Sequence, residues 1–266
     1  MIKGIGFTHE TMKFPVGEMH VKLHSYVPGS AASIDFRFEK NEDIIELLLV
    51  ANALKHAGLP LHGIFMRYVP FGRQDRIAVD GECFSLEVFA ELINSLNAEA
   101  VYVTDPHSFV TPALIKNCRV IEQCDVFEPM LQDKSNFYLI SPDGGSMKKI
   151  MKLAAKPSLL NRCIGVVECS KIREVRTGAI TETKVHRDVF NGANCIMVDD
   201  ICDGGKTFIE IAKVLKTKNV GKIILMVTHG FFTKGLQVFD GLIDEIYISE
   251  GKVTDFPSPR KADESL

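Results

Sequence analysis

The most chemically active stretch of the chain runs from Asp199 to Thr207. Asp199 and Asp200 follow an apolar run, and after Ile201 and Cys202 come Asp203 and a glycine pair. Adjacent carboxylates at the end of a strand accept hydrogen bonds from the two neighbouring hydroxyls of a ribose, directly or through a metal ion and its waters. Beyond them, the N–H groups of a glycine loop and the dipole of the following helix suit a phosphate. The stretch therefore indicates a sugar-phosphate site.

Two other interpretations of this stretch have to be weighed. Residues 205–207, Gly-Lys-Thr, look like the end of a Walker A loop, but the glycine required five positions before Gly205 is Asp200. The chain therefore has no P-loop here. Alternatively, Asp203 caps the helix while Asp199 and Asp200 are solvated charges. Three acids beside a glycine loop favour the ligand site, with which a capping role for Asp203 is compatible.

The elements that must position these residues alternate along the chain. Strand-like apolar runs precede turn signals at Gly63–Val69, Ala100–Thr104, Phe137–Ile140, Cys163–Val167, Cys195–Val198 and Lys222–Val227. Apolar residues at three- and four-residue spacing predict helices at Ile44–His56, Ser85–Leu96, Lys148–Ala155 and Thr207–Lys216. This alternation predicts an α/β fold with mainly parallel sheets flanked by helices, whose ligand sites lie beyond the carboxyl ends of strands.

The length and composition favour two domains. The chain has 266 residues, 46% of them hydrophobic, which is enough for two modest cores. The segment Glu122–Asn136 is polar, contains Pro129 and is expected to be an irregular crossing between domains. We therefore expect an N-terminal domain over residues 1–127, a C-terminal domain over 128–255 and a polar tail over 256–266.

Charge and cysteine usage exclude several classes of protein. Lys and Arg total 31 against 34 Asp and Glu, so nucleic acid is not the expected main partner. The first ten residues lack the pattern of a signal peptide, and no apolar run is long enough to span a bilayer. The seven cysteines lack the paired spacing of a zinc ribbon or a disulfide scaffold. A soluble, cytoplasmic protein with reduced thiols and no membrane partner is expected.

The acid and glycine stretch resembles the signature of phosphoribosyl pyrophosphate-binding proteins. That group includes phosphoribosyltransferases and the pyrophosphokinases that make their donor. Residues 68–76, Tyr-Val-Pro-Phe-Gly-Arg-Gln-Asp-Arg, resemble the ATP-site motif of the ribose-phosphate pyrophosphokinase family and favour the kinase. The resemblance implies that Arg73 and Arg76 hold the triphosphate and that Gln74 and Asp75 orient it or the purine. The alternative is a charged turn after a strand.

Residues 13–18 resemble the Phe-Pro-Asp-Gly-Glu element of the same family, with Val16 in place of its acid. The resemblance implies that Phe14 stacks on the adenine and that Glu18 accepts a hydrogen bond from it, both supplied by a neighbouring subunit. At least a homodimer is therefore expected. On composition alone, Phe14 would be a core residue.

Two further elements resemble metal- and ribose-binding parts of the family. Residues 104–108, Thr-Asp-Pro-His-Ser, resemble its Asp-Leu-His element, which implies that His107 lies near the magnesium ion and the phosphates, although a lone histidine is usually structural. Residues 141–143 resemble its Ser-Pro-Asp segment near the ribose, unless Asp143 only caps the next helix. Together with Asp199, these residues are the expected Mg²⁺ ligands.

Residues 170–173, Ser-Lys-Ile-Arg, resemble the catalytic Lys-x-Arg at the base of a mobile flap. Lys171 and Arg173 are two residues apart, so on a strand they face the same side, where they could neutralise charge on the transferred group. The chain continues through Arg176, Thr177 and Gly178 as an expected hairpin tip. A solvated basic hairpin is the alternative.

These resemblances run from Lys13 to Gly230 in family order. They imply an in-line attack of a ribose 5-phosphate C1 hydroxyl on the β-phosphorus of MgATP, which expels AMP and needs no protein nucleophile. Asp199 and Asp200 would bind the ribose hydroxyls or their metal, and Asp203, Gly204, Gly205, Lys206 and Thr207 would bind the 5-phosphate.

The phosphate loop departs from the family pattern Asp-Thr-Gly-Gly-Thr. Gly204 opens space beside the 5-phosphate, and Lys206 could reach a second phosphate. ADP-ribose, rebuilt towards NAD, is therefore an alternative acceptor close behind ribose 5-phosphate. A non-catalytic regulatory homologue and a phosphoribosyltransferase are the remaining alternatives.

Overall fold

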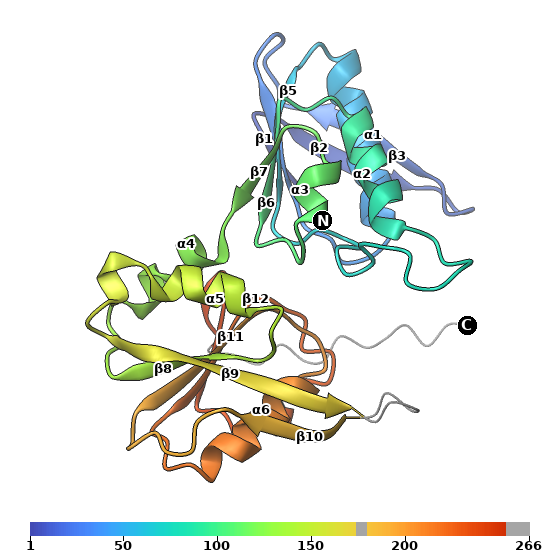
Figure 1. The fold of residues 1–266 in the computed structure, drawn as a ribbon. Helices are drawn as coiled ribbons and strands as arrows, with labels where there is room; N and C mark the ends of the chain where they lie inside the picture. The colour runs from blue at the N-terminus through green and yellow to red at the C-terminus, as the bar shows by residue number, and fades with distance from the viewer. Residues whose placement is uncertain (174–179, 254–266) are drawn as a thin grey trace. The chain divides into compact units, whose positions relative to one another are not determined.

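The computed structural model describes residues 1–173 and 180–253, and the chain divides into two compact units, Met1–Ile121 and Glu122–Leu266 (Figure 1). Each unit has its own sheet and its own buried core. Both are α/β units with mainly parallel sheets, so the predicted fold class is confirmed.

The first unit is built on a five-stranded sheet of order β1-β4-β5-β6-β7. Its strands are β1 (Ile2–Ile5), β4 (Ala32–Phe36), β5 (Leu61–Met66), β6 (Ala100–Thr104) and β7 (Cys118–Ile121), and only β1 runs antiparallel to its neighbour. Strands β2 (Thr8–Lys13) and β3 (Met19–His24) form a separate hairpin. The helices are α1 (Glu42–His56), α2 (Ser85–Ser95) and α3 (Val110–Leu114).

Helix α1 shows how local sequence sets these boundaries. The Asp43 carboxylate accepts hydrogen bonds from the backbone N–H groups of Glu39 and Lys40, at 2.7 and 2.9 Å, and so closes the turn that leads into the helix. Lys55 and His56 lie in the last turn, where positive charge suits the helix dipole. Gly58 then adopts a φ of 70°, which ends the helix and turns the chain towards β5.

The second unit is built on a seven-stranded sheet of order β10-β9-β8-β11-β12-β13-β14. Its strands are β8 (Phe137–Ser141), β9 (Cys163–Arg173), β10 (Ile180–Val185), β11 (Asn194–Cys202), β12 (Ile223–Gly230), β13 (Glu245–Ile248) and β14 (Gly251–Lys252). Neighbours are parallel except at the two edges, where β10 and β14 are antiparallel. The helical elements are α4 (Gln123–Phe127), η1 (Pro129–Leu131), α5 (Met147–Ala154), η2 (Pro157–Leu159), α6 (Lys206–Lys216) and η3 (Leu236–Phe239).

The central strand β11 is apolar along most of its length because both of its faces are covered. Ile196 and Val198 belong to the core that also contains residues of α4 and α5, while Cys195 and Met197 belong to the core that contains residues of α6. Figure 1 shows α5 and α6 on opposite sides of this sheet. Along this strand Asn194, Asp199 and Ile201 are partly exposed, and the other residues are buried.

Two local expectations are wrong. The segment Glu122–Asn136 contains α4 and η1 rather than an irregular crossing, because Cys124, Phe127 and Leu131 bury their side chains in the second unit. Phe14 is not a core residue, since 49% of it is exposed at the turn between β2 and β3. No helix in residues 1–173 or 180–253 is long and apolar enough to cross a membrane.

Candidate active site

The carboxyl ends of β8, β11 and β12 meet at one edge of the second sheet, because these three neighbouring strands are parallel. Asp199 and Asp200 lie near the end of β11, Ser141 ends β8 and Gly230 ends β12. The loops that follow these strands, residues 142–146, 203–205 and 231–235, therefore share this edge. This is the position at which parallel sheets place their ligands.

An acid group occupies this edge. Asp200 is only 8% exposed, so the alternative that it is a solvated charge is wrong. The Asp200 backbone N–H donates to Asp199 Oδ1 at 2.9 Å, and Asp200 Oδ2 lies 3.9 Å from Lys149 Nζ. Burial raises the pKa of Asp199 well above its usual range, and repulsion from Asp200 and Asp143 adds to this effect. A bound cation or ligand hydroxyls would relieve that repulsion.

Asp143 joins this acid group from the loop after β8. Its Oδ1 accepts the backbone N–H groups of Gly145 at 3.0 Å and Ser146 at 3.2 Å. The Ser141 hydroxyl donates to the Asp143 carbonyl at 2.7 Å and lies 2.8 Å from the Ser146 hydroxyl. The carboxylate therefore closes a turn that precedes α5, whose N-cap residue is Ser146 and makes no side-chain cap bond.

The glycine loop leads into α6 with a fixed shape. Gly205 has a φ of 75°, and a Cβ on it would lie 2.4 Å from Cζ of Phe239, so no other residue fits. Gly205 is also the N-cap residue of α6, which has no side-chain cap bond. Asp203 Oδ1 accepts the Thr233 hydroxyl at 2.7 Å, and the capping role of Asp203 stays a prediction.

An anion at the start of α6 would meet favourable groups. The first-turn N–H groups and the dipole of α6 favour negative charge. Lys206 is the first helical residue and is exposed, while Thr207 is half-buried behind it. The predicted phosphate loop, Asp203 to Thr207, is therefore brought to the same sheet edge as Asp199, Asp200 and Asp143.

In the first unit, the predicted ATP-site turn lies beside the predicted histidine turn. Residues 67–76 follow β5 and residues 105–109 follow its parallel neighbour β6. A Cβ on Gly72 would lie 3.8 Å from Cβ of His107, so the two turns are in contact. Arg73, Gln74, Arg76 and His107 are exposed. Asp75 is half-buried and its Oδ1 lies 3.7 Å from Arg76 Nε.

Two unusual backbone conformations hold these turns. Phe71 has a φ of 60° and Asp105 a φ of 43°, a region that residues other than glycine rarely adopt. The Phe71 ring packs 6.3 Å from Phe38 and 6.0 Å from Phe89, measured between ring centroids. Asp105 is buried, and its N–H donates to the Ile121 carbonyl at 2.9 Å. The surroundings thus fix both turns and with them the backbone of Arg73 and His107.

The predicted basic hairpin is present as strands β9 and β10. Their antiparallel register pairs Lys171 with Thr183 and Arg173 with Ile180. At the base of the hairpin, the Ser170 hydroxyl lies 2.8 Å from His186 Nε2. The tip that contains Arg176, Thr177 and Gly178, and the polar tail 256–266, lie outside the described residues.

The turn between β2 and β3 presents the predicted adenine contacts to the outside. Phe14 N–H donates to the Glu18 carbonyl at 2.8 Å, which closes the turn. Phe14 and Glu18 are exposed, and Val16 is 82% exposed. Their roles stay predictions, as do the roles of Lys171 and Arg173, whose side chains lie outside the described part of the chain.

The predicted metal ligands come from both units, with His107 in the first and Asp143 and Asp199 in the second. Within residues 1–173 and 180–253, no three His, Cys, Asp or Glu side chains are grouped to hold a metal ion by themselves. Mg²⁺ is usually bound by one or two carboxylates together with substrate phosphates. The acid group at the end of β11 fits that mode, because its oxygens repel one another without a cation.

Three side chains near the glycine loop had not been assigned from the sequence. They are Lys149, which lies near Asp200, Thr233, which bonds to Asp203, and Lys234, whose side chain packs on Gly204. Residues 233 and 234 follow a predicted strand, so the rule that ligands lie beyond strand ends would have pointed to them.

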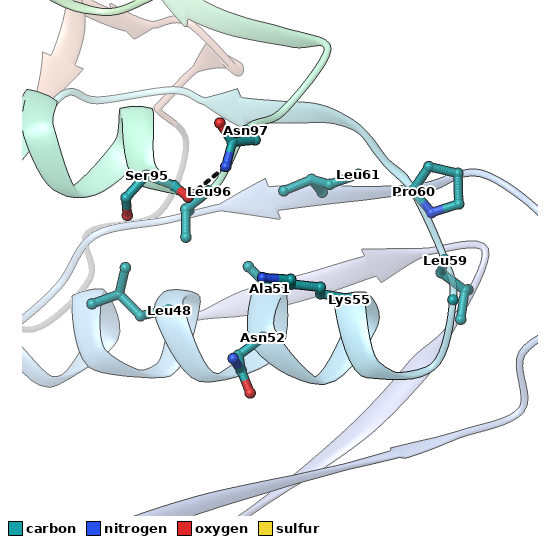
Figure 2. A pocket seen from close by; sticks show the side chains of 11 residues that line it. Leu48, Ala51, Asn52, Lys55, Leu59, Pro60, Leu61, Ser95, Leu96 and Asn97 are labelled. Atoms are coloured by element: carbon teal, nitrogen blue, oxygen red, sulfur yellow. Dashed lines mark hydrogen bonds between the residues drawn. The ribbon is translucent and has the colours of Figure 1, made fainter.

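A separate hollow lies at the opposite end of the first sheet. Figure 2 shows this cavity of about 660 Å³, lined by the second half of α1, the turn into β5 and the end of α2. Leu61, which begins β5, is part of its wall, whereas the ATP-site turn follows the end of that strand. None of the predicted site residues lines it.

Parallel sheets with an acid pair and a glycine loop beyond a central strand are typical of the phosphoribosyltransferase-like class of fold. A solved structure of phosphoribosylpyrophosphate synthetase from Mycobacterium smegmatis matches this chain with a TM-score of 0.75 at 21% identity, covering 91% of this chain and 80% of that one. A family model described as the phosphoribosyl synthetase-associated domain matches residues 183–258.

Sequence relatives identify the family. The chain is 30% identical over 234 residues to the ribose-phosphate pyrophosphokinase of Pyrococcus abyssi, covering 85% of this chain and 77% of the relative. It is 26% identical over 245 residues to the enzyme of the same name from Thermococcus kodakarensis, covering 90% and 84%. The chain belongs to the ribose-phosphate pyrophosphokinase family and is a transferase.

Proposed function

We propose that the chain transfers the β,γ-diphosphate of ATP to the C1 hydroxyl of ribose 5-phosphate and so forms phosphoribosyl pyrophosphate and AMP. The observation that carries this proposal is the acid group of Asp199, Asp200 and Asp143 beside the glycine loop that begins α6 at one sheet edge. The acids match the ribose hydroxyls and the loop matches the 5-phosphate. Membership of the pyrophosphokinase family favours transfer of a diphosphate.

In the proposed reaction, the C1 oxygen forms a bond to the β-phosphorus while the bond from that phosphorus to the bridging oxygen of AMP breaks. The hydroxyl proton passes to solvent, and no covalent enzyme intermediate forms. Asp199 and Asp200 position the sugar, and residues 203–207 bind the 5-phosphate. Lys171 and Arg173 neutralise charge that develops on the transferred group.

The nucleotide is assigned to the turns of the first unit. Arg73 and Arg76 bind the triphosphate, while Gln74 and Asp75 orient it or the purine. His107, which packs against Gly72 in the same unit, is proposed with Asp143 and Asp199 as a ligand of Mg²⁺. When bound, Mg²⁺ supplies positive charge that offsets the phosphate oxygens.

The test is AMP formation from ATP, Mg²⁺ and ribose 5-phosphate. Lys171→Ala should lower turnover about 100- to 1,000-fold while ATP binding remains measurable, because one charge near the reacting phosphorus is lost. Lys184→Ala, on the neighbouring strand β10 and paired at 3.7 Å with Glu182, is the matched control and should leave turnover unchanged.

Near-normal turnover in Lys171→Ala would remove that residue from the mechanism. Absence of AMP from the wild-type protein with every sugar phosphate tried would contradict the proposed function and favour a regulatory homologue. Release of diphosphate from phosphoribosyl pyrophosphate and a free base would instead indicate a phosphoribosyltransferase.

ADP-ribose is the second candidate acceptor, with ADP-ribose pyrophosphate for NAD resynthesis as the product. The observation that favours it is the exposed Lys206 at the start of α6, next to a loop position that carries no side chain at Gly204. Supplying each sugar separately with ATP and Mg²⁺, and comparing kcat/KM for AMP formation, decides between them.

The exposed turn that contains Phe14 and Glu18 supports an assembly of at least two copies, each completing the adenine pocket of its neighbour. A protein that uses ATP and a sugar phosphate is expected in the cytoplasm. Light scattering should give at least the dimer mass, and Phe14→Ala should raise KM for ATP. A monomer with full activity would contradict the shared pocket.

A further inference from the structure

The side chain of Lys234 lies flat on Gly204. A Cβ on Gly204 would be 3.4 Å from both Cδ and Cε of Lys234 and 3.6 Å from its Cγ. A single methyl group at position 204 therefore just fits, whereas the γ atoms of a threonine would need the space that the lysine fills. Because a single C–N bond is about 1.45 Å long, the Lys234 ammonium lies within about 5 Å of the same point.

Hydrogen bonds hold the loop of Lys234 against the phosphate loop. Phe231 N–H donates to the Cys202 carbonyl at 2.8 Å, and Thr233 N–H donates to the Asp203 carbonyl at 3.2 Å. The Thr233 hydroxyl also donates to Asp203 Oδ1 at 2.7 Å. The backbone before Lys234 is thus tied to the start of the phosphate loop, which sets where the lysine stem lies.

The positive charges near the start of α6 are unfavourable when no anion is bound there. Helix α6 begins with Lys206 and has no acidic residue in its first turn, whereas α1 has Glu42 and Asp43 and α2 has Glu87. Positive charge at a helix N-terminus opposes the helix dipole. In the described ranges, neither Lys206 nor Lys234 has a carboxylate within ion-pair distance. Two lysines therefore lie near the start of α6, Lys206 as its first residue and Lys234 packed against Gly204.

We propose that Lys234 is a specificity-determining residue of the acceptor site, which with Lys206 binds a second phosphate of an acceptor that carries a 5-diphosphate group. The inference rests on the proposed function, because it takes the loop as the site of the acceptor 5-phosphate. The loop N–H groups bind that first phosphate. Two ammonium groups beside the loop match the additional charge of a second phosphate, which a sugar monophosphate lacks.

The experiment measures binding of ribose 5-phosphate and of ADP-ribose to the full chain by calorimetry, without ATP. Lys234→Met keeps the stem and removes the charge, so it should weaken ADP-ribose binding about 10- to 100-fold and ribose 5-phosphate binding less than about threefold. Gly204→Thr should give the same selective loss by displacing the lysine.

Lys213→Met, on the same helix where Lys213 pairs with Glu210 at 2.9 Å, is the charge control and should change neither affinity. Lys234→Arg should restore most of the preference. Equal losses for both sugars in Lys234→Met, no loss for either, or unchanged ADP-ribose binding in Gly204→Thr would overturn the proposal. So would a wild-type protein that binds neither sugar.

Turnover is measured separately, so the two proposals fail differently. Selective binding without AMP release from any acceptor contradicts the diphosphokinase and leaves the role of Lys234 supported. AMP release in which Lys234→Met changes kcat/KM equally for both acceptors supports the diphosphokinase and contradicts the role of Lys234.

Discussion

At the two ends of the sheet in the second unit, two partly buried acids, Glu245 and Asp199, have opposite electrostatic surroundings. At the amino end of β13, Glu245 is surrounded by cations: Lys222 Nζ lies 2.8 Å, Lys252 Nζ 3.3 Å and Lys134 Nζ 3.7 Å from its carboxylate oxygens. The Tyr247 hydroxyl donates to it at 2.8 Å. Burial raises the pKa of Glu245, but the hydrogen bonds from Lys222, Tyr247 and Lys252 outweigh it and lower the pKa to about 2.

At the carboxyl end of β11 the surroundings of the acid shift its pKa in the opposite direction, upwards. Asp199 faces Asp200 and Asp143, and its pKa is raised by burial and by both neighbours. The Lys149 ammonium is 3.9 Å from Asp200, a long ion pair. The ion cluster around Glu245 stabilises the fold with its own residues, whereas the acid group at Asp199 keeps a repulsion that a ligand can relieve. Strained electrostatics of this kind are a mark of functional sites.

The largest expected effect is a loss of activity on changing the acid group at the carboxyl end of β11. Asp199→Asn should lower kcat/KM for AMP formation about 100- to 1,000-fold, because a charged contact to the sugar or its metal is lost. Steady-state kinetics with ribose 5-phosphate measures it. Glu245→Gln should retain wild-type turnover, and a comparable loss there would show that both ends of the sheet contribute to catalysis.

Glu245→Gln should act on stability instead. A lowered folded-state pKa means that the carboxylate stabilises the protein above its ordinary pKa of 4.5, and that this stabilisation is lost as pH falls towards 2. At pH 7 the variant should lose on the order of 2–3 kcal/mol of unfolding free energy in urea. Between pH 4.5 and 2 the wild type should lose stability more steeply than the variant.

The matched control is Glu210→Gln, which removes an exposed pair with Lys213 and should cost less than about 0.5 kcal/mol. Parallel pH profiles for Glu245→Gln and the wild type would contradict the assigned pKa of Glu245.

Asp199→Asn should raise stability while it lowers activity. A raised folded-state pKa means that ionised Asp199 costs stability at neutral pH, so an uncharged amide of similar shape relieves it. Urea unfolding at pH 7 in the presence of EDTA should show a gain of about 0.5–2 kcal/mol. A loss of stability would mean that the acid group is already compensated within the protein.

The smallest effect is expected at the rim of the Glu245 cluster. The Lys252 side chain is 47% exposed, and solvent screens its ion pair with Glu245. Lys252→Ala should cost less than about 1 kcal/mol of unfolding free energy, since Lys222 and Tyr247 remain bonded to the carboxylate. A loss as large as that of Glu245→Gln would show that Lys252 alone sets the pKa.

Much of the candidate site in the second unit can be predicted because its sequence patterns are strong and local. The strand before Asp199 is buried on both faces, so it forms a continuous apolar run, and the acids and glycines all lie between Asp199 and Gly205. The helix Thr207–Lys216 was expected one residue short of its observed start at Lys206. The turns after β5 and β6 were also located from the runs Gly63–Val69 and Ala100–Thr104.

Other features depend on distant parts of the chain. Lys134 and Tyr247 are 113 residues apart, so the cluster around Glu245 leaves no local trace. Helix α4 has five residues, too few to show a period, which is why Glu122–Asn136 was expected to be irregular. The bond from the Thr233 hydroxyl to Asp203 joins residues 30 positions apart, so it leaves no local trace either. Strand β4, with alternating Ser33 and Asp35 among its apolar residues, gave too weak a pattern.

The contact between Gly205 and Phe239 has a consequence for how a ligand is received. The ring of Phe239 occupies the place that a side chain at position 205 would need, and Gly205 has a left-handed backbone with a φ of 75°. The ordering of the loop was therefore completed when the protein folded. An arriving anion meets amides already in place, and little of its binding energy is spent on arranging them.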